Sequence, residues 1–111
     1  MAGRDAFISF CFDDQSIADR IYEALIHAGI SCWICTKEIP GGVRYPEYIT
    51  PAIKASRLVV LLHSENVFLS EEIKSEIGIA YNSQKLIYPF RIDMSPYNAF
   101  LEYRLSDGDI N

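Results

Sequence analysis

The sequence of 111 residues lacks the features that mark several large classes of protein. It has no apolar run approaching the roughly 20 residues that a membrane-spanning helix requires. Its first ten residues, MAGRDAFISF, contain neither the apolar segment nor the cleavage site of a signal peptide. Lysine and arginine are not clustered, and the formal charge of −5 argues against binding to the phosphates of nucleic acid. We therefore expect a cytoplasmic protein that binds neither a membrane nor nucleic acid.

Cysteine is also scarce, and the three residues present are too few for a disulfide scaffold. Cys32 and Cys35 form a C-x-x-C pattern, but it lies in an apolar, strand-like stretch. Neither His27 nor His63, both expected at the surface or an edge, has metal-ligand spacing to this pattern. We interpret both thiols as buried core groups, and no metal site is predicted.

The sequence does contain two alternating periodicities. Short apolar runs rich in β-branched and aromatic residues predict strands, and apolar residues spaced by three and four predict helices. The expected strands are Ala6–Phe10, Ile30–Ile34, Leu58–Leu62 and Leu86–Ile92. The expected helices are Gln15–Ala28, Pro46–Ser56 and Ser70–Tyr81. Gly29 has the usual position of a helix stop, and Ala99–Leu105 fits either a fifth strand or a short helix.

Strands that alternate with helices in a chain of this length predict a single α/β domain. Right-handed crossovers then give a parallel sheet with helices on both faces. We expect a flavodoxin-like three-layer sandwich with a five-stranded parallel sheet in the order 2-1-3-4-5. Ligands bind such folds beyond the carboxyl ends of the strands, where strands 1 and 3 separate. The loops expected there are Phe10–Asp14 and His63–Leu69, and the second leads into the helix that carries Glu76.

Glu76 is the carboxylate that this topology brings near the expected ligand site. Ser70 is a suitable N-cap for its helix, and Glu71 and Glu72 lie in the first turn, where the helix dipole favours carboxylates. The spacing alone leaves open whether Glu76 is a solvated helix residue or a group directed into a cleft. In a cleft, a carboxylate can stabilise positive charge that develops on a ribose when nicotinamide leaves as a neutral molecule.

Other chemistries on this topology have less support. A receiver-type phosphoacceptor domain needs an aspartate at the end of the third strand, where this sequence has His63 and Ser64. The only Gly-Gly pair follows the second strand and matches neither a P-loop nor a dinucleotide fingerprint. Asp13 and Asp14 have a sufficient role as caps of the following helix, and Ser9 is a minor candidate for ligand contact.

Four sequence blocks together resemble a TIR (Toll/interleukin-1 receptor) domain, and prokaryotic forms most closely. These blocks are FISF with its acidic turn, GISCWICTKEIPGGVRY, AIKASRLVVLLHSENVFLSEEIKSEIGIAY and IYPFRID. The resemblance spans roughly Asp5 to Asp109, so residues 1–111 are interpreted as a single TIR domain. It implies the same flavodoxin-like fold.

The resemblance also implies an NAD⁺ glycohydrolase (NADase), which releases nicotinamide and either ADP-ribose or a cyclic isomer. NAD⁺ is then the substrate, no cofactor is needed, and Glu76 is the catalytic residue. Activity is expected to require homotypic TIR–TIR assembly, because the loop Thr36–Tyr45 of one subunit helps to complete the cleft of another. The residues expected to bind substrate are Phe10, Cys11, Phe12, Asp14, Lys37, Glu38, Ser70 and Glu72.

Two positions depart from the family pattern. Phe10 stands where a tyrosine is common, and Glu72 stands where an aromatic residue is frequent, one turn before Glu76. Family habit further implies an N-terminal effector part of a longer chain, with a fused sensor domain and a role in bacterial anti-phage defence. The alternative is a non-enzymatic adaptor, in which the loop only pairs TIR domains and Glu76 is a solvated helix residue.

Overall fold

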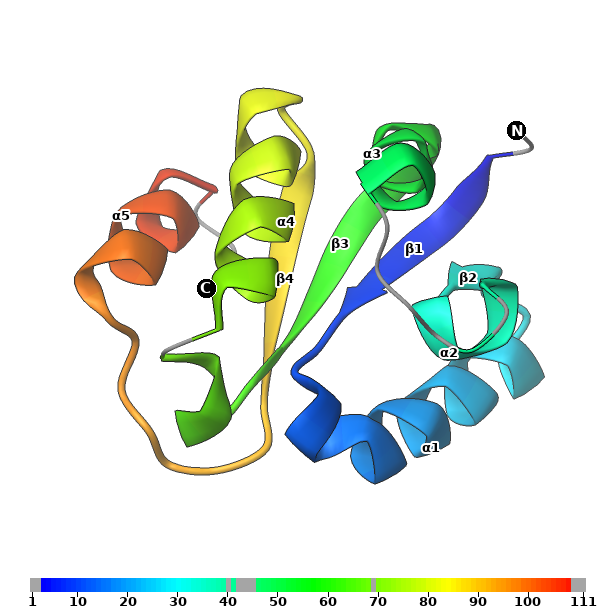
Figure 1. Cartoon of the computed structure of the whole chain (residues 1–111), viewed down its shortest axis with the longest axis horizontal. Coiled ribbons are helices and arrows are strands. Elements are labelled where there is room, and N and C mark those ends of the chain that lie inside the picture. The colour runs from blue at the N-terminus through cyan, green and yellow to red at the C-terminus, as the bar shows by residue number, and fades with distance from the viewer. Residues whose placement is uncertain (1–2, 40, 42–45, 69, 109–111) are drawn as a thin grey trace.

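The sheet has four parallel strands whose order agrees with the prediction (Figure 1). In this computed structural model, which describes residues 3–39, 41, 46–68 and 70–108, they are β1 (Arg4–Ser9), β2 (Cys32–Trp33), β3 (Ser56–His63) and β4 (Leu86–Arg91). Their order across the sheet is β2-β1-β3-β4. β1 and β3 are therefore the central strands, and Ile8 of β1 lies opposite Val60 of β3.

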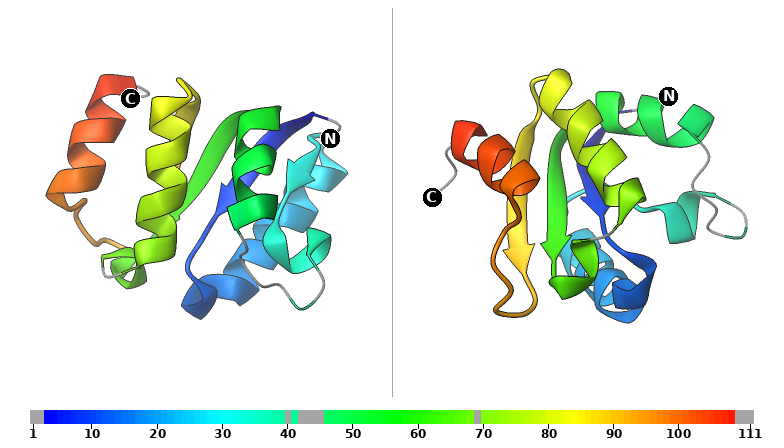
Figure 2. Two further views of the ribbon diagram at one scale, coloured as in Figure 1. Left: turned by 45° about the horizontal axis from the view of Figure 1, so that its top comes forward. Right: turned by 60° about the vertical axis from the view of Figure 1, so that its left-hand side comes forward.

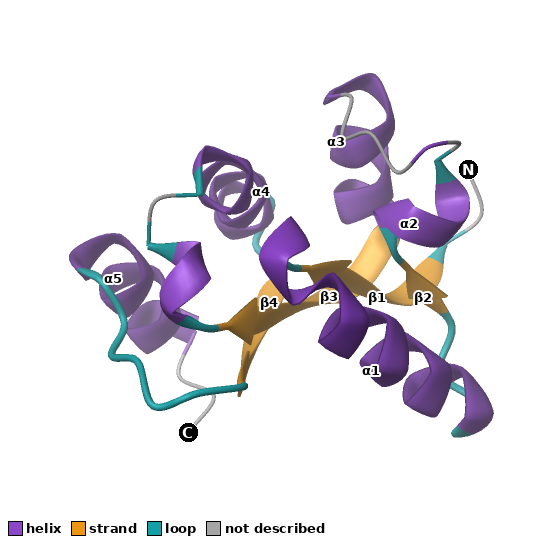
Figure 3. Cartoon of the chain, turned by 60° about the horizontal axis from the view of Figure 1, so that its bottom comes forward, coloured by secondary structure: helices purple, strands orange, loops and turns teal. Residues whose placement is uncertain are grey.

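The helices form layers on the two faces of the sheet (Figure 3). They are α1 (Gln15–His27), α2 (Cys35–Glu38), α3 (Pro46–Ala55), α4 (Glu71–Asn82) and α5 (Ala99–Gly108). α1 lies on one face, and α3 and α4 lie on the other. α5 runs beside α4 (Figure 2), and two short 3-10 helices, Phe12–Asp14 and Glu65–Val67, occupy the loops after β1 and β3.

The described residues contain no fifth strand, although the sequence predicted five. The stretch Ala99–Leu105 that fitted either a strand or a helix forms most of α5. Asn98 caps this helix, because its Oδ1 accepts a hydrogen bond from the Leu101 backbone N–H at 2.9 Å. Leu101 and Leu105 are both buried, and their spacing of four gives the helix one apolar side.

The segment around β2 also differs from the prediction. β2 contains only two of the five residues expected, because the chain turns from Ile34 directly into α2. The predicted loop Thr36–Tyr45 therefore begins as a helix, and its residues 40 and 42–45 lie outside the described part of the chain. The stop of α1 is confirmed, since Gly29 has a φ of 85° in the left-handed region.

The core fills the spaces between the sheet and its helices. The central strands are buried on both faces, as is typical of parallel sheets, with Phe7, Ile8, Val59, Leu61 and Leu62 all nearly inaccessible. Trp33 stacks on Phe7, with 5.1 Å between the ring centroids. Cys32 and Cys35 are buried free thiols, as predicted, and burial raises the pKa of Cys32.

The face that carries α1 keeps an apolar cleft of about 320 Å³ beside that helix. Ile21 and Leu25 of α1 line one side, and Tyr88 and Phe90 of β4 line the other. Tyr88 and Phe90 are 50% and 44% exposed, whereas Ile87, the residue before Tyr88, is buried. β4 thus covers the core on one face and presents aromatic side chains on the other.

Candidate active site

α4 buries Glu76 through the same apolar spacing that predicted the helix. The Ser70 hydroxyl caps its first turn by accepting a hydrogen bond from the Ile73 backbone N–H at 3.2 Å. Ile73 and Ile77 pack in the core and are almost inaccessible. Glu76 lies between them on the helix and is only 4% exposed. It is therefore not the solvated residue that the spacing had left open.

The hydroxyl of Ser9 holds this carboxylate. Ser9 is the last residue of β1, is fully buried, and donates a hydrogen bond from Oγ to Glu76 Oε1 at 2.7 Å. The carboxyl end of a central strand thus meets the second turn of α4. Sequence reasoning treated Ser9 as a minor candidate for ligand contact and missed this pairing, because 67 residues separate the two side chains along the chain.

Glu76 lines a cleft of about 230 Å³ between α3 and α4. The lining residues are Pro46, Ile49 and Thr50 from α3 and Glu71, Glu72, Ser75, Glu76 and Ile79 from α4. Three carboxylates and two hydroxyl groups therefore line the cleft together with apolar side chains. Within the described part of the chain, no lysine or arginine lines this cleft. Such a site favours a ligand that carries positive charge beside an apolar part.

Of the predicted substrate-binding residues on α4, Glu72 lines this cleft and Ser70 mainly caps the helix. Ser70 also lies 3.4 Å from Glu72 Oε1, at the long end of hydrogen-bond range. Glu72 is exposed, whereas Glu76 one turn later is buried. The two carboxylates that the sequence placed one turn apart are thus brought to the same cleft in different environments.

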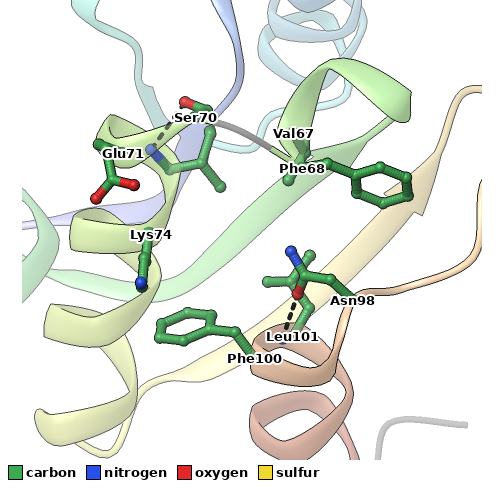
Figure 4. A pocket seen from close by; sticks show the side chains of 9 residues that line it. Val67, Phe68, Ser70, Glu71, Lys74, Asn98, Phe100 and Leu101 are labelled. Carbon is green, nitrogen blue, oxygen red and sulfur yellow. Dashed lines mark hydrogen bonds between the residues drawn. The ribbon is translucent and has the colours of Figure 1, made fainter.

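A smaller cleft of about 100 Å³ lies between the starts of α4 and α5 (Figure 4). The polar groups at its two helix starts are already engaged, because Ser70 caps α4 and Asn98 caps α5. The ammonium of Lys74 lies 5.6 Å from the centroid of the Phe100 ring. This cleft does not include Glu76, and its volume is less than half that of the cleft between α3 and α4.

Asp14 ties together the two loops expected at the ligand site. It is 7% exposed and accepts hydrogen bonds from Ser64 Oγ at 2.6 Å and from Asn66 Nδ2 at 2.9 Å. Asp14 stands at the N-cap position of α1, as predicted, but its side chain makes no capping hydrogen bond to the helix. Its partners in the loop after β3, too distant in the sequence to be predicted, take up the carboxylate instead.

The aromatic residues after β1 divide between the core and the surface. Phe10 is fully buried, and its ring packs edge-on against Phe12 with 5.8 Å between centroids. Phe12 is 49% exposed, so part of its ring faces solvent. Cys11 is partly exposed, and partial burial raises the pKa of its thiol. Phe10 is thus a core residue, and Phe12 and Cys11 are the members of this group that reach the surface.

Lys37 and Glu38 lie on α2 and contact other parts of the same chain. Glu38 forms a bidentate ion pair with Arg4 at the start of β1, with nitrogen–oxygen distances of 2.8 and 3.3 Å. Lys37 lies 3.9 Å from Glu23 of α1. Arg4 begins β1, whereas Ser9 ends it, so the structure does not bring Glu38 to Glu76 within one chain.

His63 was predicted at the surface or an edge, and this prediction is wrong. The side chain is fully buried at the end of β3, where its ring centroid lies 4.6 Å from that of Tyr97. Nε2 lies 3.1 and 3.2 Å from the carbonyl oxygens of Ser95 and Pro96, so it carries the hydrogen. His63 thereby holds the loop between β4 and α5. The apolar run that directly precedes His63 could have suggested that this residue is buried as well.

The parallel four-stranded sheet covered by helices defines a small α/β domain. The sequence model of the TIR domain family matches residues 6–109, nearly the whole chain. The protein belongs to the TIR domain family, as the sequence resemblance predicted.

Solved TIR structures share this fold at low sequence identity. The TIR domain of the Toll-related receptor TRR-2 from Hydra magnipapillata has a TM-score of 0.78 and 20% identity, covering 90% of this chain and 79% of that one. A metazoan TIR-STING receptor from C. gigas has a TM-score of 0.78 and 23% identity, covering 97% and 38%. The TIR domains of the activated Roq1 resistosome, which recognises the effector XopQ, have a TM-score of 0.74 and 22% identity, covering 98% and 72%.

A curated relative carries an activity in its name. It is a probable 2′ cyclic ADP-D-ribose synthase, BdTIR, from Brachypodium distachyon, 25% identical over 96 residues. The match covers 86% of this chain but only 43% of that relative. In the described part of the chain, no helix has the length and apolar character needed to cross a membrane.

Proposed function

We propose that this TIR domain cleaves NAD⁺ at the bond between nicotinamide and ribose. The observation that carries the proposal is the setting of Glu76, a buried carboxylate that accepts a hydrogen bond from Ser9 and lines the cleft between α3 and α4. A scaffold does not need a buried acid at a cleft, because burial of a carboxylate costs free energy that apolar packing would avoid.

The reaction suits a single carboxylate. When the bond between C1′ of the ribose and the pyridinium nitrogen breaks, its electron pair returns to the ring, and nicotinamide leaves as a neutral molecule. Positive charge then develops on the ribose, where an adjacent Glu76 carboxylate would stabilise it. Water completes hydrolysis to ADP-ribose with loss of a proton, and a hydroxyl group of the same molecule gives a cyclic isomer instead.

The rest of the cleft agrees with a cationic aromatic substrate. Glu71 and Glu72 add negative charge, which favours a pyridinium ring over its neutral product. Ile49 and Ile79 provide apolar surface on the two facing helices. Release of nicotinamide removes the charge that these carboxylates favour, so the cleft holds the substrate more tightly than the leaving group.

The relative from Brachypodium distachyon supports this reaction class, because the activity in its name is the synthesis of a cyclic ADP-ribose. For this chain the proposal covers either the linear or the cyclic product. Activity depends on homotypic assembly, in which residues 36–45 of one subunit help to complete the cleft of another. We propose that the domain acts in cytoplasmic immune signalling, which in bacteria would be anti-phage defence. We also propose that the same polypeptide carries a sensor domain.

The proposal is tested by measuring nicotinamide release from NAD⁺ at several protein concentrations, with and without a crowding agent. Assembly is followed in the same samples by light scattering. We expect turnover to increase with assembly and to fall at least a hundredfold in Glu76→Gln, which has nearly the same shape without the charge. Glu102→Gln on the exposed side of α5 is the matched control and should retain turnover.

Assembled wild-type protein that releases no nicotinamide would contradict the proposal and favour the adaptor. In that case Glu76 has only a structural role, and its substitution should alter neither assembly nor binding between TIR domains.

A further inference from the structure

The hydrogen-bonded pair of Ser9 and Glu76 is almost completely shielded from solvent. Ser9 is fully buried and Glu76 is 4% exposed, and their oxygens lie 2.7 Å apart. Because an ionised carboxylate has no hydrogen to offer, the Ser9 hydroxyl is the donor. Such charge-assisted bonds are stronger than those between neutral groups.

The position of Ser9 also separates its role from that of the cleft-lining residues. Ser9 belongs to a central strand and is not among the residues that line the α3–α4 cleft, whereas Glu76 is. The Ser9 hydroxyl therefore reaches Glu76 from the side of the sheet, and the cleft reaches it from the side of the helices. A substrate in the cleft would contact Glu76 without contacting Ser9.

We propose that Ser9 is a positioning residue for Glu76, which keeps the carboxylate ionised and fixed at the wall of the cleft. This inference rests on the proposed NAD⁺ cleavage for its kinetic consequence, but its structural part can be measured without any activity. Within the described part of the chain, the other charged groups that line the cleft are Glu71 and Glu72, which lie on α4. The described lining residues of α3 carry no charge, so Ser9 offsets the repulsion between carboxylates that would favour protonation of Glu76.

Removal of the hydroxyl should slow the reaction more than it weakens substrate binding. In Ser9→Ala a larger fraction of Glu76 is protonated at a given pH, and the carboxylate is less fixed. We expect kcat to fall about ten- to hundredfold, the range that loss of one hydrogen bond to a charged group implies. KM should change little, because Ser9 does not line the cleft. The acid limb of the pH–rate profile should move to higher pH.

The experiment compares Ser9→Ala with two other variants in full-length protein. Ser9→Thr retains a hydroxyl group on a residue suited to a strand and should restore most of the rate. Ser56→Ala is the matched control. Ser56 is a buried serine of β3 whose hydroxyl donates to the Ala52 backbone carbonyl at 2.8 Å, so the same chemical group is lost without contact to Glu76.

A second measurement follows the ionisation of Glu76 directly. The carboxyl carbon of Glu76 is assigned by NMR through comparison with Glu76→Gln, and its chemical shift is recorded across a pH titration. We expect the midpoint to lie at higher pH in Ser9→Ala than in wild type and to be unchanged in Ser56→Ala. If Ser9→Ala does not fold, Ser9→Cys takes its place, because a thiol of similar size is only a weak donor.

The two measurements distinguish failure of this inference from failure of the proposed function. An unchanged titration midpoint in Ser9→Ala overturns the positioning role, whether or not the protein cleaves NAD⁺. A wild-type protein that assembles but does not cleave NAD⁺ removes the proposed function, and the titration still decides what Ser9 does. A shifted midpoint together with a lower kcat and a constant KM supports both.

Discussion

Asp14 and Glu76 are two buried carboxylates that the fold uses differently. Both oxygens of Asp14 accept hydrogen bonds from Ser64 and Asn66, side chains that belong to a neighbouring loop. Glu76 accepts a hydrogen bond from Ser9 and at the same time lines the cleft between α3 and α4. Burial of an acid therefore does not by itself mark a reactive group. What separates Glu76 is the combination of a fixed carboxylate and a cleft beside it.

The largest effect on stability is expected from Asp14→Ala. Loss of this carboxylate leaves the Ser64 hydroxyl and the Asn66 amide without their acceptor and separates the loops after β1 and β3. We expect the free energy of unfolding to fall by about 2–4 kcal/mol, as for other buried and hydrogen-bonded groups. Urea unfolding followed by circular dichroism measures the change.

Asp14→Asn is the control for this experiment, because its remaining carbonyl oxygen can still accept from Ser64. It should lose less stability than Asp14→Ala. Equal unfolding midpoints for Asp14→Ala and wild type would show that the Asp14 hydrogen bonds contribute nothing to the fold. The contrast between Asp14 and Glu76 would then disappear.

The helix around Glu76 could be predicted because its information is local. Ser70, the acidic first turn and the spacing of Ile73 and Ile77 all lie within a few residues of one another, and α4 forms where they indicate. The order of the four strands also followed, because alternating strands and helices with right-handed crossovers leave few alternatives. These predictions required no knowledge of distant contacts.

The errors arose where distant residues decide the outcome. Asp14 stands at the N-cap of α1 as expected, but donors about 50 residues away take the carboxylate that was expected to bond to the helix. His63 was expected at the surface, but the loop between β4 and α5 covers its ring. Local patterns cannot supply the partners of Asp14 and His63. The stretch Ala99–Leu105 is different, because the sequence left it open between a strand and a helix although Asn98, whose side chain caps the helix, stands directly before it.

A smaller effect is expected from Glu38→Gln. This carboxylate forms its ion pair with Arg4 where both side chains are partly exposed, at 25% and 32% respectively. Because water screens such pairs, we expect a loss of at most about 1 kcal/mol in the free energy of unfolding, which added salt should reduce further. Urea unfolding at two salt concentrations measures this. A loss as large as that of Asp14→Ala would mean that burial is not what separates the two carboxylates.

Asp93 provides the last comparison. Like Asp14 it accepts two hydrogen bonds, but its donors are backbone groups and it lies at the surface. Its oxygens accept hydrogen bonds from the backbone N–H groups of Glu65 and Ser95, both at 2.9 Å, and these bonds lower the pKa of Asp93 below its usual value of 3.8.

A carboxylate with a lowered pKa in the folded state stabilises the protein above its unfolded pKa, and this contribution is lost as the pH falls through the folded value. We therefore expect wild-type stability to decrease from about pH 4 downwards, and Asp93→Asn to show a shallower decrease over that range. Unfolding midpoints measured between neutral and acidic pH test this, with Glu102→Gln as an exposed control that keeps the wild-type slope. If Asp93→Asn also keeps that slope, the two backbone hydrogen bonds do not couple Asp93 to folding. If Asp93→Asn flattens the slope, fixed donors are enough for a carboxylate to hold two loops together. Burial then determines how much stability the contact adds.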